Sequence, residues 1–198
     1  MLLLNSFGSS PAQLSASESQ AALSGTVVLA VDLRELTSLR DVPRVGDVFF
    51  RRIERQSRAN DEYDLAIRGS ASAEWKGIFG GADDNRAPHA FAVEPGTYVI
   101  DKINIGGGMT TIGPGIDAQS HTPRFGSFVV RGGEVLNLGR LVVHMHWQEG
   151  YFGAKVGDNT AEARKILVDS NQDLAARLQT RLLSVVPRFA FQMSGGRL

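Results

Sequence analysis

The chain has 198 residues, which is enough for one substantial domain with its own hydrophobic core. Its 21 basic and 21 acidic side chains cancel, so it lacks the basic excess that is typical of nucleic-acid-binding proteins. It contains no cysteine, which excludes disulfides, thiolate catalysis and zinc sites built on cysteine.

The first 24 residues predict a flexible tether. Residues 5–22 are rich in Ser, Ala and Gln and have little apolar surface to bury, as in a link between an export signal or lipid anchor and a folded domain. Residues 1–4 are apolar but lack the basic residues that open a signal peptide. An ordinary frayed terminus is the alternative. From the tether we expect a cell-envelope protein, periplasmic or associated with the outer membrane, that meets the membrane only through an N-terminal anchor.

The next part of the chain predicts three strands, at residues 25–33, 47–53 and 63–68. The first of them, GTVVLAVDL, is apolar on both faces, which favours a central position in a sheet.

Arginines cluster in and after the second strand, and such a cluster can bind phosphate or a lipid headgroup. They are Arg51, Arg52, Arg55 and Arg58. Three carboxylates follow directly, namely Asp61, Glu62 and Asp64. We therefore interpret the cluster as locally neutralised.

Two long irregular segments, residues 69–90 and 106–124, are predicted to be loops that project from the sheet framework. The second is rich in glycine, but no Gly-Lys-Ser/Thr follows its glycines, and it matches no phosphate-binding fingerprint. It predicts a flexible connection between strands.

Residues 91–147 form the most regular stretch of the chain. Alternate residues from Phe91 through Asp101 to Ile105 form a period-2 run, which pauses at Pro95-Gly96. Residues 125–130 and 134–147 repeat the pattern around a predicted tight turn at Gly132-Gly133. Alternation bounded by Gly and Pro indicates half-buried antiparallel strands.

The C-terminal part changes period after a predicted turn region at residues 148–158. Asn159 and Glu162 form a capping-box pattern, and apolar residues at spacings of three and four then run from Ala163 to Val185. One helix is predicted here, or two if Ser170 starts a second one. Pro187 ends the pattern, and residues 188–193 alternate again as a last strand.

His144 and His146 are the candidate metal ligands. Residues two apart on a strand point to the same face, so both imidazoles can bind one divalent metal ion. A third ligand is required, with His89, His121 and Glu149 as candidates. The favoured interpretation is different: Val143 and Met145 face the core, and the histidines face solvent.

Large apolar side chains in the loops indicate a surface for a protein or glycan partner, with packing inside the fold as the alternative. The candidate partner-binding residues are Trp75, Phe79, Met109, Tyr151 and Phe152, with Trp147 beside them. The chain has no Gly-x-Ser-x-Gly motif and no recognisable Ser/His/Asp set, so no catalytic residue is predicted.

Several of these residues form a recurring pattern. A Pro95-Gly96-Thr97-Tyr98 strand is followed by Phe128-Val129-Val130, then Gly133-Glu134-Val135 and Leu138-Gly139. The pattern resembles that of small bacterial cell-envelope proteins, many of them lipoproteins of unknown function, with a transthyretin-like or carboxypeptidase-regulatory-like β-sandwich. The resemblance covers residues 91–147 and implies no catalytic residues. This chain has Asn137 where an aromatic residue is usual, and it has no lipobox cysteine.

We therefore expect an antiparallel β-sandwich of about seven to nine strands with one or two C-terminal helices. The expected divisions are a tether (1–24), the sandwich (25–158) and a helical extension packed on it or on a partner (159–198). The expected function is that of a non-catalytic accessory or binding module, or a subunit of a larger envelope assembly, without a cofactor. The alternative is a metal-dependent enzyme or a metal-binding β-barrel.

Overall fold

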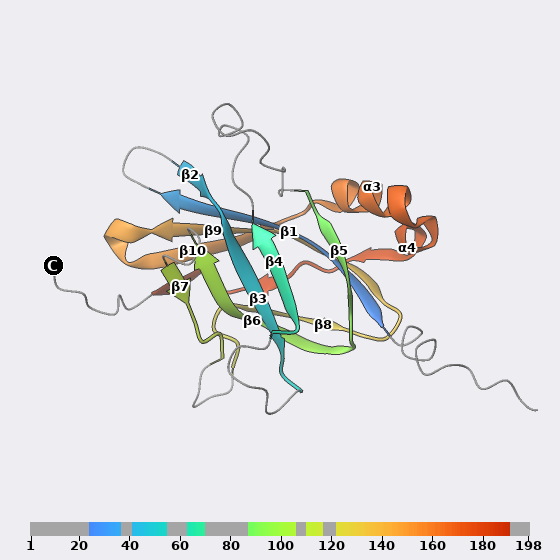
Figure 1. Cartoon of the computed structure of the whole chain (residues 1–198), viewed down its shortest axis with the longest axis horizontal. Coiled ribbons are helices and arrows are strands. Elements are labelled where there is room, and N and C mark those ends of the chain that lie inside the picture. Colours follow the sequence, from blue (N-terminus) through green and yellow to red (C-terminus); the bar gives the residue numbers. More distant parts are fainter. Residues whose placement is uncertain are drawn as a thin grey trace, which may run out of the picture.

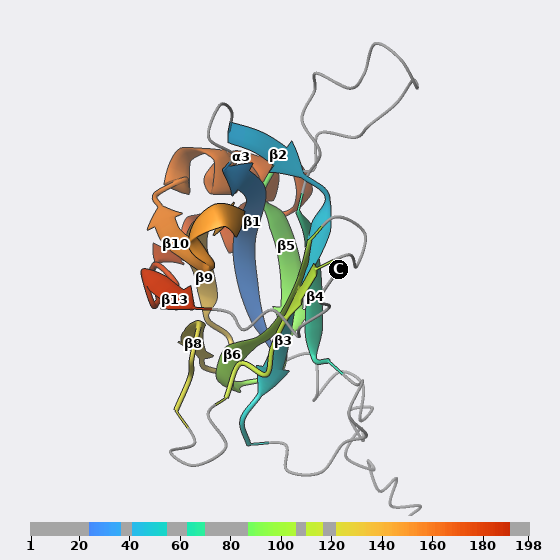
Figure 2. The same cartoon turned by 90° about the vertical axis from the view of Figure 1, so that its left-hand side faces the viewer.

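Two β-sheets pack face to face, and two short helices lie against the outer side of one of them (Figures 1 and 2). The computed structural model describes residues 24–36, 41–54, 63–69, 87–105, 110–116 and 122–190. The predicted mainly antiparallel β-sandwich with C-terminal helices is confirmed.

Sheet A has the strand order β13-β10-β9-β1-β2, with β5 also on β1 and β11 also on β9. Its long central strands β1 and β9 run parallel, unlike the antiparallel pairing that the sequence predicts. The strands of sheet B separate β1 from β9 in the chain, so β9 is not a hairpin partner of β1. The bounds are β1 (Gly25–Leu36), β2 (Asp41–Arg44), β5 (His89–Val93), β9 (Val135–His146), β10 (Tyr151–Gly157), β11 (Leu178–Thr180) and β13 (Arg188–Ala190).

Sheet B has the strand order β12-β8-β6-β3-β4, with β7 also on β6, and all its pairings are antiparallel. The predicted pause at Pro95-Gly96 is the place where the chain leaves β5 in sheet A and enters β6 in sheet B. The bounds are β3 (Gly46–Arg52), β4 (Leu65–Gly69), β6 (Gly96–Ile105), β7 (Thr110–Ile112), β8 (Gly126–Val130) and β12 (Ser184–Val185).

The main core lies between the two sheets. Alternate residues of β1 enter it, and they are Val27, Leu29, Val31 and Leu33. Val28 on the opposite face is also fully buried, which confirms the central position predicted for this strand. Full burial of one such side chain contributes about 1.5–3 kcal/mol to folding.

A β-bulge in β9 explains why Asn137 stands where the pattern that residues 91–147 resemble has an aromatic residue. The register with β1 shifts next to Leu29, and Gly139 takes a left-handed φ of 89°. The side chain of Asn137 is fully buried, accepts a hydrogen bond from the backbone N–H of Gly139 at 3.0 Å and donates one to Oγ1 of Thr160 at 3.1 Å. An aromatic side chain at position 137 would make neither bond, so this bulge favours asparagine.

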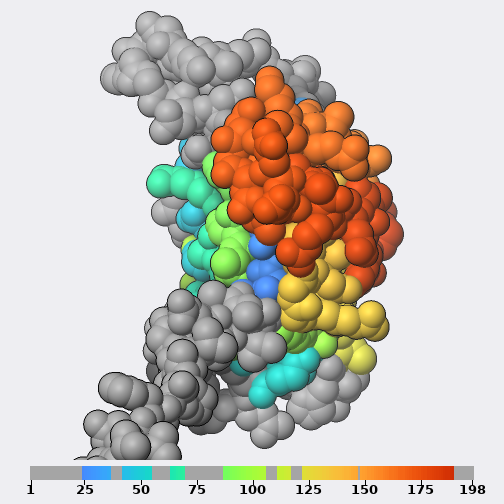
Figure 3. All heavy atoms as spheres, turned by 90° about the vertical axis from the view of Figure 1, so that its right-hand side faces the viewer, coloured from blue at the N-terminus to red at the C-terminus, as the bar shows by residue number. Residues whose placement is uncertain are grey.

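The helices α3 (Thr160–Ser170) and α4 (Gln172–Arg177) cover part of the outer face of sheet A. Ala163, Leu167 and Ala175 form a second, smaller core with Val28 and Val135. In the space-filling view, the orange and red atoms of this C-terminal part gather on one side of the molecule (Figure 3). No helix in the described ranges has the length and apolar character that a membrane crossing requires.

The predicted helical stripe from Ala163 to Val185 is wrong beyond Arg177. The chain becomes extended at Leu178, and β11, β12 and β13 then pair with β9, β8 and β10. Residues 178–190 therefore belong to the two sheets and not to a helical extension. This segment pairs with the edges of existing strands, and such tertiary pairing overrides the helix propensity of its residues.

The predicted helix caps are also wrong in detail. The Asn159 side chain makes no cap hydrogen bond, and Oδ1 of Asp158 accepts one from the backbone N–H of Thr160 at 2.8 Å. The hydroxyl of Thr160 also donates to Asp158, and this bond, then the one from the backbone N–H, holds the pKa of Asp158 below its usual value. Asn171, rather than Ser170, caps α4 through Leu174. The predicted turn at residues 148–158 contains the strand β10, preceded by the short helix η2 (Trp147–Glu149).

Candidate functional site

A β-bulge in β6 brings two charged residues to the same side of sheet B. Phe49 pairs with Lys102 and Phe50 pairs with Ile100, so Asp101 is an extra residue on β6. Ile100 and Ile103 both face the core. The strict alternation predicted through Asp101 is therefore wrong by one residue at this place. A classic bulge re-aims side chains in this way, and it leaves Asp101 and Lys102 together on the outer face.

These two residues lie at a hollow of about 550 Å³, which we call the bulge hollow. Its volume falls in the range of about 300–1,000 Å³ that is usual for small-molecule sites. It is lined by Arg51, Tyr63, Asp101, Lys102, Thr111, Gly113, Pro114 and Ile116. Strands β3 and β6, the approach to β4 and the segment after β7 thus all contribute to it.

Asp101 is held in the bulge hollow through both of its carboxylate oxygens. It is 8% exposed, and its Oδ2 pairs with Nη2 of Arg51 at 2.9 Å. Its Oδ1 accepts a hydrogen bond from the backbone N–H of Gly115 at 3.2 Å. The carboxylate therefore orients the guanidinium of Arg51. Nε of Arg51 is buried and has no hydrogen-bond partner among the residues that the structure describes.

The two cations of the bulge hollow, Arg51 and Lys102, make cation–π contacts with aromatic rings. The rings of Phe49 and Tyr63 contact each other at 4.6 Å between centroids. Nζ of Lys102 lies 5.6 Å from the first centroid and 5.8 Å from the second, and Cζ of Arg51 lies 5.7 Å from that of Tyr63. Each such cation–π contact is worth about 0.5–1 kcal/mol at an exposed site. Lys102 forms no ion pair within the described part of the chain, so its charge is available.

Gly113, Pro114 and Ile116 form one wall of the bulge hollow, and Gly115 lies between them in the chain. A Cβ atom on Gly115 would lie 1.7 Å from the carbonyl oxygen of Ile100, so only glycine allows this approach. The carbonyl of Gly115 accepts a hydrogen bond from the N–H of Arg124 at 2.7 Å. In residues 110–116, the glycines therefore allow the loop backbone to pack closely against β6. Residues 106–109 and 117–121 of the same loop lie outside the described residues.

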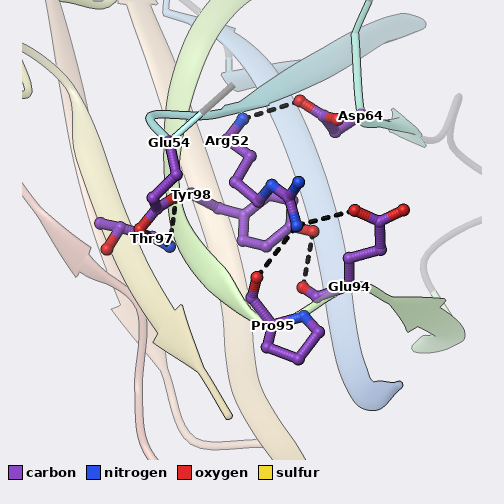
Figure 4. A network of polar contacts seen from close by, with 7 residues as sticks. All are labelled: Arg52, Glu54, Asp64, Glu94, Pro95, Thr97 and Tyr98. Atoms are coloured by element: carbon purple, nitrogen blue, oxygen red, sulfur yellow. Dashed lines mark hydrogen bonds and ion pairs between the residues drawn. The ribbon is translucent and has the colours of Figure 1, made fainter. Parts of the chain in front are cut away.

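A polar network at the other end of β6 fixes how this strand starts (Figure 4). The hydroxyl of Tyr98 donates to the carbonyl of Glu94 at 2.8 Å, and Nη1 of Arg52 reaches the carbonyl of Pro95 at 3.0 Å. Glu54 accepts hydrogen bonds from the backbone N–H of Thr97 at 2.8 and 3.1 Å. This arrangement resembles the tyrosine corner of other β-sandwiches, and it gives the Pro-Gly-x-Tyr motif a structural role.

The same contacts affect the acidity of Glu54. Partial burial raises its pKa, but hydrogen bonds from its own backbone N–H and from Thr97 outweigh that effect, together with the charge of Arg52. The pKa of Glu54 is therefore held below its usual value of 4.5. The carboxylate stays ionised at neutral pH, as the network requires.

The arginine cluster is only partly described. Arg51 pairs with Asp101, while Arg52 pairs with Glu94 at 2.7 Å and donates its backbone N–H to Asp64 at 2.8 Å. For Arg51 and Arg52, the described ion pairs are therefore made with carboxylates distant in the sequence. Arg55, Arg58, Asp61 and Glu62 lie outside the described residues.

His144 and His146 lie on the outer face of sheet A, and both are half-buried. Val143 and Met145 between them face the core, which confirms the predicted orientation of this strand. The ring of His146 stacks on Tyr151 at 4.1 Å, and Cζ of Arg188 lies 3.6 Å from the same tyrosine centroid.

No group of three His, Asp or Glu side chains that could hold a metal ion occurs within the ranges that the structure describes. His121, one of the candidate third ligands, lies outside those ranges. A metal site at His144 and His146 therefore stays a prediction.

The predicted partner-binding residues divide into three groups. Tyr151 is half-buried on the outer face of sheet A. Phe152 is fully buried in the core and stacks on Phe189 at 5.6 Å, so its prediction as a surface contact is wrong. The alternation of β10 turns Tyr151 outward and Phe152 inward. Trp75, Phe79 and Met109 lie outside the described residues, and so does the side chain of Trp147.

The bulge hollow was not predicted from the sequence, although the sequence contains one signal for it. Asp101 and Lys102 are two consecutive polar residues between Ile100 and Ile103, and they interrupt a period-2 apolar run. Such an interruption in a strand is what an extra, bulged residue produces. Known proteins offer no further guide, since no family model, no curated protein and no solved structure matches this chain.

Proposed function

We propose that this protein is a non-catalytic binding module of the bacterial cell envelope and that the bulge hollow is where it binds its ligand. One observation carries the proposal: a bulge in β6 and a close-packed glycine wall bring charged and aromatic side chains from three segments to one concave place. Binding sites are commonly concave, with an apolar part and a few well-oriented polar groups.

The state of Asp101 favours binding over catalysis at this place. Its two carboxylate oxygens are engaged by Arg51 and by the backbone of Gly115. A general base needs a lone pair directed at the proton that it removes. A carboxylate held in this way acts instead as a support that orients Arg51 toward a ligand.

The envelope location rests on the tether-like composition of residues 5–22 and on the resemblance of residues 91–147 to cell-envelope proteins. Within this proposal the module acts as an accessory protein or as a subunit of a larger envelope assembly. Its partner is a glycan or a protein of the envelope.

The test is capture of envelope components by the purified full chain, compared with the double variant Tyr63→Ala/Lys102→Met. We expect the wild-type protein to retain a glycan or a protein that the double variant loses. Lys155→Met, which removes an exposed lysine from β10 in the other sheet, is the matched control and should capture as the wild type does. Capture that is absent, or equal in the wild type and the double variant, would refute the proposed function.

A further inference from the structure

We infer that the bulge hollow is an anion site that receives the carboxylate of an acidic glycan. The inference rests on the proposed function and names its ligand class. The charged groups that line the hollow are two cations, Arg51 and Lys102, and one carboxylate, Asp101. The ion pair between Arg51 and Asp101 accounts for one cation, so one positive charge remains.

Lys102 supplies the remaining charge. Its ammonium lies over the rings of Phe49 and Tyr63, which fix its position without neutralising it. No ion pair of Lys102 is found in the described ranges. An anion that enters the hollow therefore meets a positioned ammonium group whose charge is uncompensated, and charge-assisted hydrogen bonds are stronger than neutral ones.

Arg51 offers a second donor group at the same place. Its guanidinium lines the hollow, and its Nη2 is paired with Asp101. The planar donor set of arginine matches the two oxygens of a carboxylate.

The other walls favour a sugar as the carrier of that carboxylate. Pro114, Ile116 and the ring of Tyr63 are apolar, while Thr111 supplies a hydroxyl group. A pyranose ring presents C–H groups to apolar walls and hydroxyls to polar side chains. A protein partner needs a broad interface of about 800 Å² on each side, whereas this hollow is a small, open concavity lined by eight residues.

The experiment measures binding to the full chain by titration calorimetry with four probes. They are a trimer of galacturonic acid, a neutral glucose trimer, a glutamate-rich peptide and inorganic phosphate. We expect the galacturonate trimer to bind most tightly, with an affinity that falls as salt is added. Lys102→Met keeps the aliphatic stem over the rings and should weaken this binding at least about tenfold. Lys155→Met should leave it unchanged.

Each of the other possible outcomes would refute a specific part of the inference or of the proposed function. Equal binding of the neutral and acidic trimers would refute the anion site while the proposed binding function stands. Tighter binding of the peptide, or phosphate binding as tight as that of the trimer, would refute the acidic glycan. If no probe binds but envelope capture still depends on Tyr63 and Lys102, only this inference fails. If that capture fails as well, the proposed function fails with it.

Discussion

Tyr98 secures the place where the chain crosses from sheet A to sheet B. It is 2% exposed, its ring stacks on Phe128 at 5.0 Å, and its hydroxyl donates to the carbonyl of Glu94 at 2.8 Å. Tyr98→Phe keeps the stack but leaves this carbonyl without that donor, so it should destabilise the protein by about 1–2 kcal/mol. Urea unfolding measures the loss. Tyr151→Phe should cost less than about 0.5 kcal/mol, as is usual at a surface position, and equal losses in both variants would contradict the assigned role.

Gly115 is the residue on which the wall of the bulge hollow depends. An added Cβ would collide with the backbone carbonyl of Ile100, which cannot move without breaking β6. Gly115→Ala should therefore cost about 2–3 kcal/mol, the size of a severe overpacking effect, and should shift the NMR signals of Asp101 and Lys102. At Gly157 an added Cβ has nothing within 4 Å, so Gly157→Ala is the control. A Gly115→Ala variant as stable as this control would show that residues 113–116 do not pack as described.

At the scale of an element, the turn between β8 and β9 is held by one carboxylate. Glu134 accepts a hydrogen bond from the backbone N–H of Arg131 at 2.8 Å and pairs with Arg181 at 3.0 Å. The bond from Arg131, then the contact with Arg181, hold the pKa of Glu134 below its usual value of 4.5. Because the folded state lowers this pKa, the unfolded state binds the proton more readily at acid pH, and the contribution of Glu134 to stability is present above pH 4.5.

That contribution should disappear as the pH falls from 4.5 through the lowered pKa of the folded state. Glu134→Gln should therefore reduce the stability at neutral pH but make little difference at strongly acid pH. Urea midpoints of both proteins across this pH range measure the effect, with Glu149→Gln at an exposed position as the control for lost charge. A difference between wild type and Glu134→Gln that does not change with pH would contradict this assignment.

At the scale of the whole molecule, the C-terminal helices and the sandwich should unfold together. After α4 the chain returns to both sheets through β11, β12 and β13, so the helices cannot detach without breaking these pairings. Leu167 is 1% exposed and joins α3 to Val28 of the central strand. Leu167→Ala should cost about 2–5 kcal/mol and lower the stability of the entire fold.

Circular dichroism and hydrogen exchange report on this cooperativity. Both should show one transition, shifted to lower urea in Leu167→Ala. The adjacent Val168 is 46% exposed, so Val168→Ala should cost less than about 1 kcal/mol. A separate early transition of the helical region would show that residues 160–177 form an independent unit.

Local patterns in the sequence determined much of this fold. The alternation of β1, β3, β6, β8 and β9 needs only the burial of one or both strand faces, and the breaks at Pro95-Gly96 and Gly132-Gly133 need only local backbone geometry. The orientation of Val143, His144 and Met145 followed from the same period. These features depend on residues that are close together in the chain, so they can be predicted from it.

Only the tertiary structure decided the parallel pairing of β1 with β9, the strands β11 and β12 and the bulge hollow. Each depends on which distant segment meets an open strand edge, as when Leu178 becomes extended beside Val135. The hollow needs the register of β6 against β3, because a shift of one residue puts Asp101 and Lys102 on one face. It also needs Gly115 to reach the backbone of Ile100. Apart from two polar residues in an apolar strand, no local sequence pattern indicates this register or this approach of Gly115. The sequence by itself therefore determined most of the strands, while their packing created the candidate site.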